Sequence, residues 1–235
     1  MHANDLEKLL STRKIWRASR HPSAEGCSLD SGHPLLNQHL PDEGWPTSGL
    51  TELLCDQAGI GELSLLGPAL MQLSQKQGWI VWIDPPYWPY APALAQQGID
   101  LSRVVLLKTQ SQTEQLWALE TLLKATYCHA VLFWPKHYSP KALRRLQVAS
   151  RHGNSWGIAF RPLSCQSQAS PAPLRIRLCR SAQQEQAGLG VEILKRPGAW
   201  ASPTFHLPIQ NEIRTTNSSP DLALRKNTTG VLTTL

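Results

Sequence analysis

The sequence has 235 residues, of which 41% are hydrophobic, and its 23 Lys and Arg against 17 Asp and Glu give a formal net charge of +6. A chain of this length can bury one sizeable core, so we expect one domain with tails. It contains no apolar run long enough for a signal peptide or a membrane span, which predicts a cytoplasmic protein. The positive charge favours acidic partners such as nucleic acid, but the cations are spread along the chain and no single basic run marks a DNA site.

Five cysteines are scattered through the sequence without a CxxC pair or a Cys/His spacing suited to zinc. They are Cys27, Cys55, Cys128, Cys165 and Cys179. An odd number at irregular spacing indicates reduced and mostly buried thiols. We therefore expect no metal site.

The first 40 residues are charged at the start and then loop-like, which predicts a loosely packed N-terminal segment over 1–40. From residue 50 to residue 162, short apolar runs alternate with longer periodic ones. This alternation is typical of βαβ units around a largely parallel sheet. The expected strands are 50–55, 79–83, 104–107, 130–134 and 156–160.

Three helices are expected between these strands. The first carries a leucine stripe over 63–73, although Pro68 should kink or delay it. The second, over 111–123, opens with a serine and a glutamate at capping-box spacing. The third, over 139–153, has a proline at its first helical position and a glycine at its end.

The character of the sequence changes beyond residue 162. Two alternating segments, 174–180 and 190–196, predict a hairpin with a mobile linker at an antiparallel edge of the same sheet. The last residues are rich in Asn, Thr and Ser without an apolar period and should be disordered. The expected organisation is a loosely packed segment over 1–40, one α/β domain over 41–209 and a disordered tail over 210–235.

The stretch LTELLCDQAGIGELSLL, over 50–66, has the strand, glycine-containing loop and helix of a phosphate-binding P-loop, which reads G-x-x-x-x-G-K-[ST]. Gly59 and Gly61 serve the turn, but Asp56 stands at the first glycine, Glu62 at the lysine and Leu63 at the hydroxyl. An anion about 4 Å from a phosphate oxygen turns an attraction of roughly 4 kcal/mol into a repulsion of similar size. We therefore expect a tight strand-to-helix turn and no cofactor, with residual nucleotide binding as the weaker alternative.

No catalytic set accompanies this loop. An ATPase of this type would carry an acidic residue at the end of a later strand. Asp84, after 79–83, is the only carboxylate at such a position, and alone it is interpreted as a turn residue. His129, His137 and His152 lie near the ends of predicted elements without a nucleophile at a suitable spacing. The chain is thus expected not to be an enzyme.

The order of these elements resembles the core of RecA-type recombinases over about residues 40–209. The motifs that carry the resemblance are GWPTSGLTELL, GIGELSLL, WIDPPYWPYAPAL, LWALETLL, LRRLQVASRHGNSWGIAFRP and LGVEILKRPG. They resemble most the ImuA family, RecA-like accessory proteins of bacterial mutagenesis cassettes, and more distantly the SulA family of cell-division inhibitors. The resemblance implies a RecA-like three-layer α/β core with a mainly parallel sheet and an antiparallel C-terminal edge hairpin.

In function, the resemblance implies a non-catalytic accessory protein of SOS-induced, error-prone translesion DNA synthesis. Its implied partners are the Y-family-like ImuB, an error-prone C-family polymerase and, beyond these, RecA and DNA. The alternative is a SulA-like inhibitor of cell division that binds FtsZ, although SulA-like proteins tend to lack the extended hairpin and tail of 174–235. A second alternative is a weak DNA-stimulated ATPase in which Lys108 or Lys136 replaces the missing lysine.

Three groups of side chains are candidate surfaces for a partner or for DNA, with a solvated face or packing over the sheet edge as the alternative interpretation. The basic side of the third helix carries Lys141, Arg144, Arg145 and Arg151. The outward side of the hairpin is expected to carry Arg175, Arg177, Lys195 and Arg196. The rigid stretch PPYWPYAP would present Tyr87, Trp88 and Tyr90, and Trp200 is a further aromatic candidate.

Overall fold

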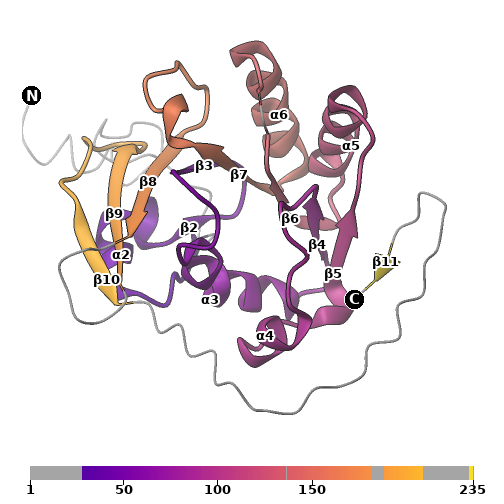
Figure 1. Ribbon diagram of the computed structural model, residues 1–235, viewed down its shortest axis with the longest axis horizontal. Helices are drawn as coiled ribbons and strands as arrows, with labels where there is room; N and C mark the ends of the chain where they lie inside the picture. The colour runs from indigo at the N-terminus through magenta and orange to yellow at the C-terminus, as the bar shows by residue number, and fades with distance from the viewer. Residues whose placement is uncertain (1–27, 136, 181–187, 209–232, 235) are drawn as a thin grey trace, which may run out of the picture.

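The computed structural model describes residues 28–135, 137–180, 188–208 and 233–234. A long twisted sheet forms its centre (Figure 1). The strands of this sheet are β3 (Gly49–Cys55), β4 (Trp79–Ile83), β5 (Val104–Leu107), β6 (Cys128–Phe133), β7 (Trp156–Pro162), β8 (Leu174–Arg180), β9 (Gly188–Lys195), β10 (Phe205–Pro208) and β11 (Thr233–Thr234). Among the described residues, their order across the sheet is β10-β9-β8-β3-β7-β6-β4-β5-β11.

Most of this sheet is parallel. The strands from β8 through β3, β7, β6 and β4 to β5 pair in parallel, whereas β9, β10 and β11 each pair antiparallel with the neighbouring strand. The expected mixed α/β sheet with an antiparallel C-terminal edge is therefore confirmed. The linker of the hairpin, predicted to be mobile, lies at 181–187 outside the described residues.

Helices cover both faces of the sheet. The helices are α2 (Pro34–His39), α3 (Glu62–Ser74), α4 (Ala91–Gln96), α5 (Gln112–Lys124) and α6 (Pro140–Gly153), with short 3-10 turns at Pro41–Glu43, Leu101–Arg103 and Leu163–Cys165. In Figure 1, α5 and α6 lie side by side on one face, while α3 and α4 lie on the other. A small second sheet pairs β1 (Ser28–Leu29) with β2 (Trp45–Pro46).

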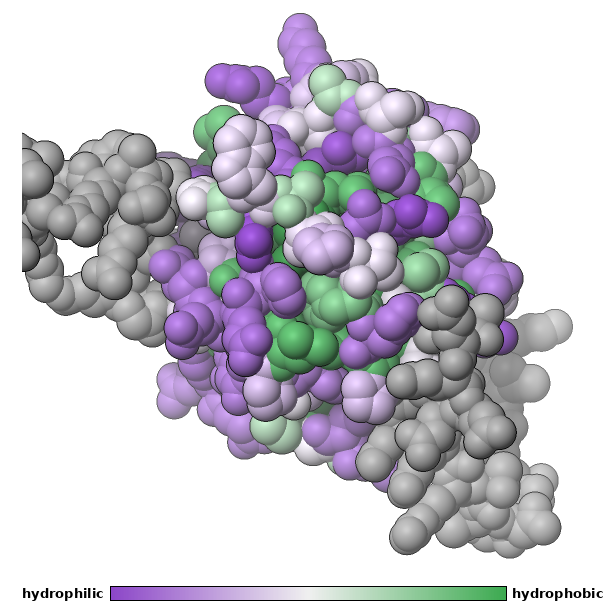
Figure 2. Space-filling model, turned by 90° about the vertical axis from the view of Figure 1, so that its left-hand side faces the viewer, coloured by the Kyte–Doolittle hydropathy of each residue, from purple (hydrophilic) through white to green (hydrophobic). Residues whose placement is uncertain are grey.

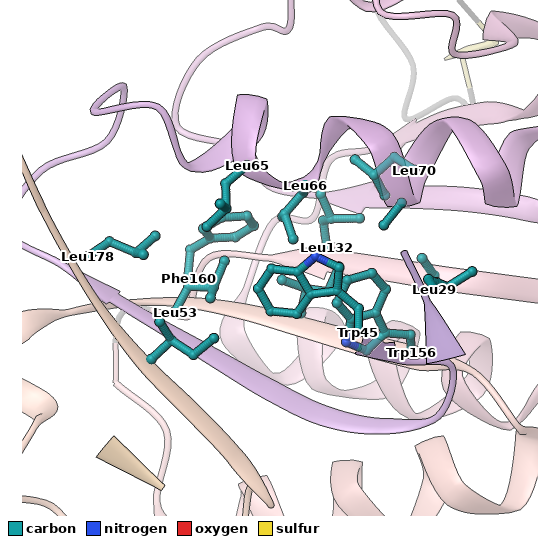
Figure 3. Packing of buried hydrophobic residues seen from close by; sticks show 14 of the residues in the cluster. Leu29, Trp45, Leu53, Leu65, Leu66, Leu70, Leu132, Trp156, Phe160 and Leu178 are labelled. Atoms are coloured by element: carbon teal, nitrogen blue, oxygen red, sulfur yellow. The ribbon is translucent and has the colours of Figure 1, made fainter. Parts of the chain in front are cut away.

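The period of two along each strand divides the apolar side chains between two cores. On β4, Ile80 and Trp82 belong to the core beneath α3, whereas Val81 and Ile83 belong to the core beneath α5 and α6. Figure 3 shows the first core, in which Trp45 and Trp156 lie together with ring centroids 5.5 Å apart. Because both faces are buried, the central strands read as continuous apolar runs.

The expected helix starts are confirmed at α5 and α6. The Ser111 hydroxyl accepts a hydrogen bond from the Glu114 N–H at 3.2 Å, and Ser139 caps α6 in the same way. The expected delay of α3 is wrong, because the helix begins at Glu62 and continues through Pro68. A Cβ added to Gly32 would lie 2.6 Å from the Pro68 ring, so this proline packs closely against the N-terminal region.

The described part of the N-terminal segment contributes to the core. Leu29, Leu36 and Leu40 are buried in the cluster beneath α3. The domain boundary at residue 41 stays a prediction, and 1–27 lies outside the described residues, as does most of the expected tail over 210–235. Within the part of the chain that the structure describes, no helix is both long and apolar enough to cross a membrane.

Candidate functional site

The loop between β3 and α3 is closed by the carboxylate of Glu62. One oxygen of this buried side chain accepts the N–H of Gly59 at 2.8 Å, and the other accepts those of Ile60 and Gly61 at 2.9 Å and 3.1 Å. Gly59 and Gly61 have φ of +83° and +116°, a left-handed backbone that favours glycine. These are the N–H groups that would surround a phosphate in a P-loop.

An internal anion therefore occupies the place of the phosphate. Charge repulsion at Glu62 was expected from the sequence, but its hydrogen bonds to the loop were not. The signal was available, because a glutamate directly after G-x-G can fold back onto the preceding amides. Burial, with the charges of Glu62 and Asp56, also raises the pKa of the neighbouring Cys55 thiol to about 11.

Aromatic rings pack together near the ends of β7, β6 and β4, the strands that follow β3 across the sheet. Trp134, the residue after β6, stacks on Phe160 of β7 with ring centroids 4.5 Å apart, and it lies 5.9 Å from the ring of Trp82. An ATPase of this type would use an acidic residue at the end of such a strand. Among the residues described at these strand ends, the structure thus shows neither the cation nor the carboxylate of that chemistry.

Asp84 is a structural residue at the end of β4. Its carboxylate accepts hydrogen bonds from the Thr109 N–H at 2.8 Å, the Thr109 hydroxyl at 2.5 Å and the Gln115 amide at 2.9 Å. Tyr138 donates to the same Gln115 side chain, and burial together with the Asp84 charge raises the pKa of this tyrosine. These contacts tie β4 to the start of α5, in agreement with the interpretation of Asp84 as a turn residue.

Of the two proposed replacements for the P-loop lysine, the structure tests only Lys108 and does not support it. Lys108 follows β5, which lies four strand positions from β3 in the sheet, and its amino group is 3.4 Å from the Pro85 carbonyl. Four strand spacings amount to roughly 19 Å, so Lys108 does not stand beside the loop. Lys136 lies outside the described residues.

A buried ion cluster joins β3, β7 and β8. The two carboxylate oxygens of Glu52 bind Arg161 at 3.0 Å and Arg175 at 2.8 Å, and all three residues are buried. The expectation that Arg175 faces outward is therefore wrong, because its guanidinium is turned toward Glu52 and also donates to the carbonyls of Cys165 and Gln166. A glutamate inside an apolar strand was the available signal, since a buried carboxylate requires partners.

The other hairpin cations are also engaged. Arg177 is half-buried and pairs with Glu192 at 3.2 Å, whereas Lys195 is exposed and its amino group reaches the Ser170 carbonyl at 3.0 Å. Arg196 donates to the carbonyls of His39 and Trp200. Figure 2 views the side of the molecule where β9 and β10 lie, and there hydrophilic residues surround a central apolar area. Within the described part of the hairpin, Arg175, Arg177, Lys195 and Arg196 thus form no continuous row of free cations.

The basic side of α6 is exposed as expected. The side chains of Lys141, Arg144 and Arg151 are exposed, and so is Arg145, which pairs with Glu120 of α5. Hydrogen bonds from Lys124 and Arg145 lower the pKa of the Glu120 carboxyl. Trp117 of α5 is 69% exposed. The sequence did not indicate that this tryptophan lies in the same helical layer as the basic side of α6.

The aromatic loop after β4 is the largest cluster of exposed aromatic side chains among the described residues. Tyr87 is 74% exposed, and Trp88 and Tyr90 are each 66% exposed. A small hollow beside Trp88 is lined by Pro85, Pro86, Leu106, Leu107 and Lys108. Sequence reasoning identified the aromatic residues, whereas the contribution of β5 depends on strand order and was missed.

These features define an α/β protein with a closed loop and exposed aromatic side chains. Comparison with known proteins agrees with this class. Residues 50–157 match the sequence model of the family described as cell division inhibitor SulA. The central part of the chain is thus similar to the SulA family, whose description as an inhibitor agrees with the expectation that the chain is not an enzyme.

Two relatives and one solved structure are similar to parts of the chain. The cell division inhibitor SulA of Yersinia pestis (strain Pestoides F) is 31% identical over 100 residues, which are 43% of this chain and 60% of that protein. The one of Pectobacterium atrosepticum is 28% identical over 151 residues, or 63% of this chain and 89% of that protein. The crystal structure of SulA from Pseudomonas aeruginosa aligns at 25% identity over 48% of this chain and 97% of that chain, with a TM-score of 0.41. The chain therefore spans 60% of the length of the Yersinia relative.

The family match corrects the expected function. The matched family is SulA and not ImuA, so the expected role as a platform for translesion synthesis is wrong. The expected partners, namely ImuB, the C-family polymerase, RecA and DNA, are wrong with it. Several motifs that suggested ImuA lie within residues 50–157, the region that matches SulA. The more distant of the two resemblances is thus the one that the comparisons support.

Proposed function

We propose that this protein is a cytoplasmic inhibitor of cell division in the SOS response, which acts by binding FtsZ without catalytic turnover. The observation that carries the proposal is the match of residues 50–157 to the SulA family. This region contains the loop closed by Glu62, the aromatic loop after β4 and helix α5. A protein whose loop amides are held by its own carboxylate has no free phosphate cradle, which favours a binding role over nucleotide chemistry.

The aromatic loop is the surface proposed to contact FtsZ. Tyr and Trp are enriched at the centres of protein interfaces because they bury much area at a low cost in side-chain entropy. Tyr87, Trp88 and Tyr90 together are exposed on a loop that contains three prolines and is anchored through Asp84. A rigid loop loses little conformational entropy on binding, so its aromatic side chains can contribute more to affinity.

The RecA-like character of the core is part of the same proposal. It is supported by the chain order of strand, loop and helix at β3 and α3, followed by β4, β5, α5 and β6. The basic side of α6 is proposed as a secondary contact for an acidic segment of the partner. The cations of this side are Lys141, Arg144, Arg145 and Arg151.

Expression in dividing bacterial cells and direct binding to purified FtsZ test the function together. Wild-type protein should cause filamentation and bind FtsZ. Trp88→Ala should weaken binding by about 30-fold or more, the effect of losing about 2 kcal/mol at an interface hot spot. Trp200→Ala is the matched control, because Trp200 is 92% exposed but lies outside the matched residues. Wild-type protein that neither binds FtsZ nor causes filamentation would contradict the proposal.

A further inference from the structure

β5 lies at an edge of the sheet that the described residues cover only thinly. On one side β5 pairs in parallel with β4 along its whole length, from Val104 to Leu107. On the other side it pairs with the two residues of β11, Thr233 opposite Leu106 and Thr234 opposite Val105. Figure 1 shows β11 beside β5 at the end of the sheet, far along the chain from the elements that surround it. The unpaired main-chain N–H and C=O groups of an edge strand can form hydrogen bonds with any extended segment that reaches them.

The same edge adjoins the exposed aromatic loop. The hollow beside Trp88 is formed by the prolines of that loop on one side and by Leu106, Leu107 and Lys108 on the other. An antiparallel strand longer than β11 would continue past Leu107 to this hollow. It would bring its own side chains against the Trp88 ring and the exposed Lys108 amino group. The edge and the aromatic loop therefore form one continuous surface.

We propose that the β5 edge is a docking site for an extended segment of the partner protein, and that Thr233–Thr234 is an internal cover that competes with this segment. The identity of the partner as FtsZ rests on the proposed function. The docked segment would carry an apolar side chain for the hollow and a carboxylate for Lys108. Main-chain pairing would give affinity and these two side chains would give selectivity, as in other cases of strand addition.

A two-residue cover is suited to be displaced. The pairing that the structure describes consists of the few main-chain hydrogen bonds that two residues make, and short strands are marginal on their own. If the covered state is populated about ten times more than the open one, the apparent affinity for a docking strand falls about ten-fold. Removal of the cover should therefore raise the apparent affinity for the docking strand about ten-fold.

The test uses the full chain with Thr233→Pro and Thr234→Pro, which removes both N–H groups of the cover. Thr233→Ser with Thr234→Ser is the matched control, because it keeps the backbone. Hydrogen exchange of the β5 amides that β4 does not bind should be faster in the proline variant than in the control. FtsZ should bind the proline variant about ten-fold more tightly, and adding Trp88→Ala should remove this gain.

A synthetic peptide of residues 224–235 separates this inference from the proposed function. Added to the proline variant, the peptide should slow the exchange of the same β5 amides and compete with FtsZ. Unchanged β5 exchange in the proline variant, or no protection by the peptide, would overturn the inference even if FtsZ binds. Peptide protection without any FtsZ binding would support the edge as a strand-docking site and refute the proposed function instead.

Discussion

Removal of the Glu62 carboxylate should destabilise the fold although this residue stands where a P-loop has its functional lysine. The carboxylate accepts three backbone N–H groups, from Gly59, Ile60 and Gly61. A hydrogen bond to a charged group contributes about 1.5–3 kcal/mol. Gly59 is exposed and Gly61 is half-buried, so water can replace part of their bonds, whereas Ile60 is buried. We therefore expect Glu62→Ala to cost about 2–4 kcal/mol rather than the sum of three full bonds.

Chemical and thermal unfolding followed by circular dichroism measure this cost. For a chain of this size, 1 kcal/mol shifts Tm by about 2–4 °C, so the expected decrease is on the order of 5–15 °C. Glu62→Gln should also destabilise the protein, because the amide can accept on one side only and places an N–H₂ group against a backbone donor.

Asp56→Asn is the matched control for Glu62. It removes the same charge from the same loop, but Asp56 is exposed and its substitution should change stability by less than about 0.5 kcal/mol. Equal stability of the wild type, Glu62→Ala and Asp56→Asn would refute the reasoning, because the loop amides would then not depend on the carboxylate. A larger loss for Asp56→Asn would show that net charge, rather than hydrogen bonding, controls the loop.

Three further predictions concern the ion cluster, the α6 surface and a buried thiol. Glu52→Ala should cost about 3–5 kcal/mol in urea unfolding because it leaves two buried guanidinium groups unpaired, while Glu192→Ala in the half-exposed pair should cost about 1 kcal/mol or less; equal losses would contradict this. Arg144→Glu with Arg145→Glu should leave Tm nearly unchanged and weaken FtsZ binding at low salt, and unchanged affinity would remove α6 from the interface. Because the Cys55 pKa is raised from 9.0 to about 11, its alkylation at pH 8, followed by mass spectrometry, should be about 100-fold slower in the folded than in the unfolded chain. The preference for the neutral thiol stabilises the fold below pH 9 and is lost as the pH rises toward 11; equal alkylation rates would refute the burial argument.

The central elements were predictable because their signals are local. The strands after residue 50, the cap at Ser139 and the end of α6 at Gly153 follow from apolar period, capping and turn chemistry within a few residues. The missing lysine was equally readable, because the P-loop pattern is a contiguous motif. The short edge strands β10 and β11 were missed, since a two- to four-residue strand has too few residues to show a period.

The predicted function was wrong at the level of the family. The sequence indicated a non-catalytic α/β protein with a degenerate loop, and it placed the aromatic side chains of the β4 to α4 connection on a surface. The sequence favoured a resemblance to ImuA over one to SulA because residues 174–235 extend beyond the usual SulA length. The match over residues 50–157 reverses that order.

The sequence by itself determined the α/β alternation, the loss of the P-loop cation and the identity of the exposed aromatic residues, because each depends on neighbours in the chain. Tertiary structure alone decided that Arg175 is buried against Glu52 and that β5 lies beside the aromatic loop. These outcomes depend on strand order and on side-chain direction. Both arise when segments that are distant in the sequence pack together, 123 residues apart for Glu52 and Arg175 and 23 for Pro85 and Lys108, and no local pattern records such a contact.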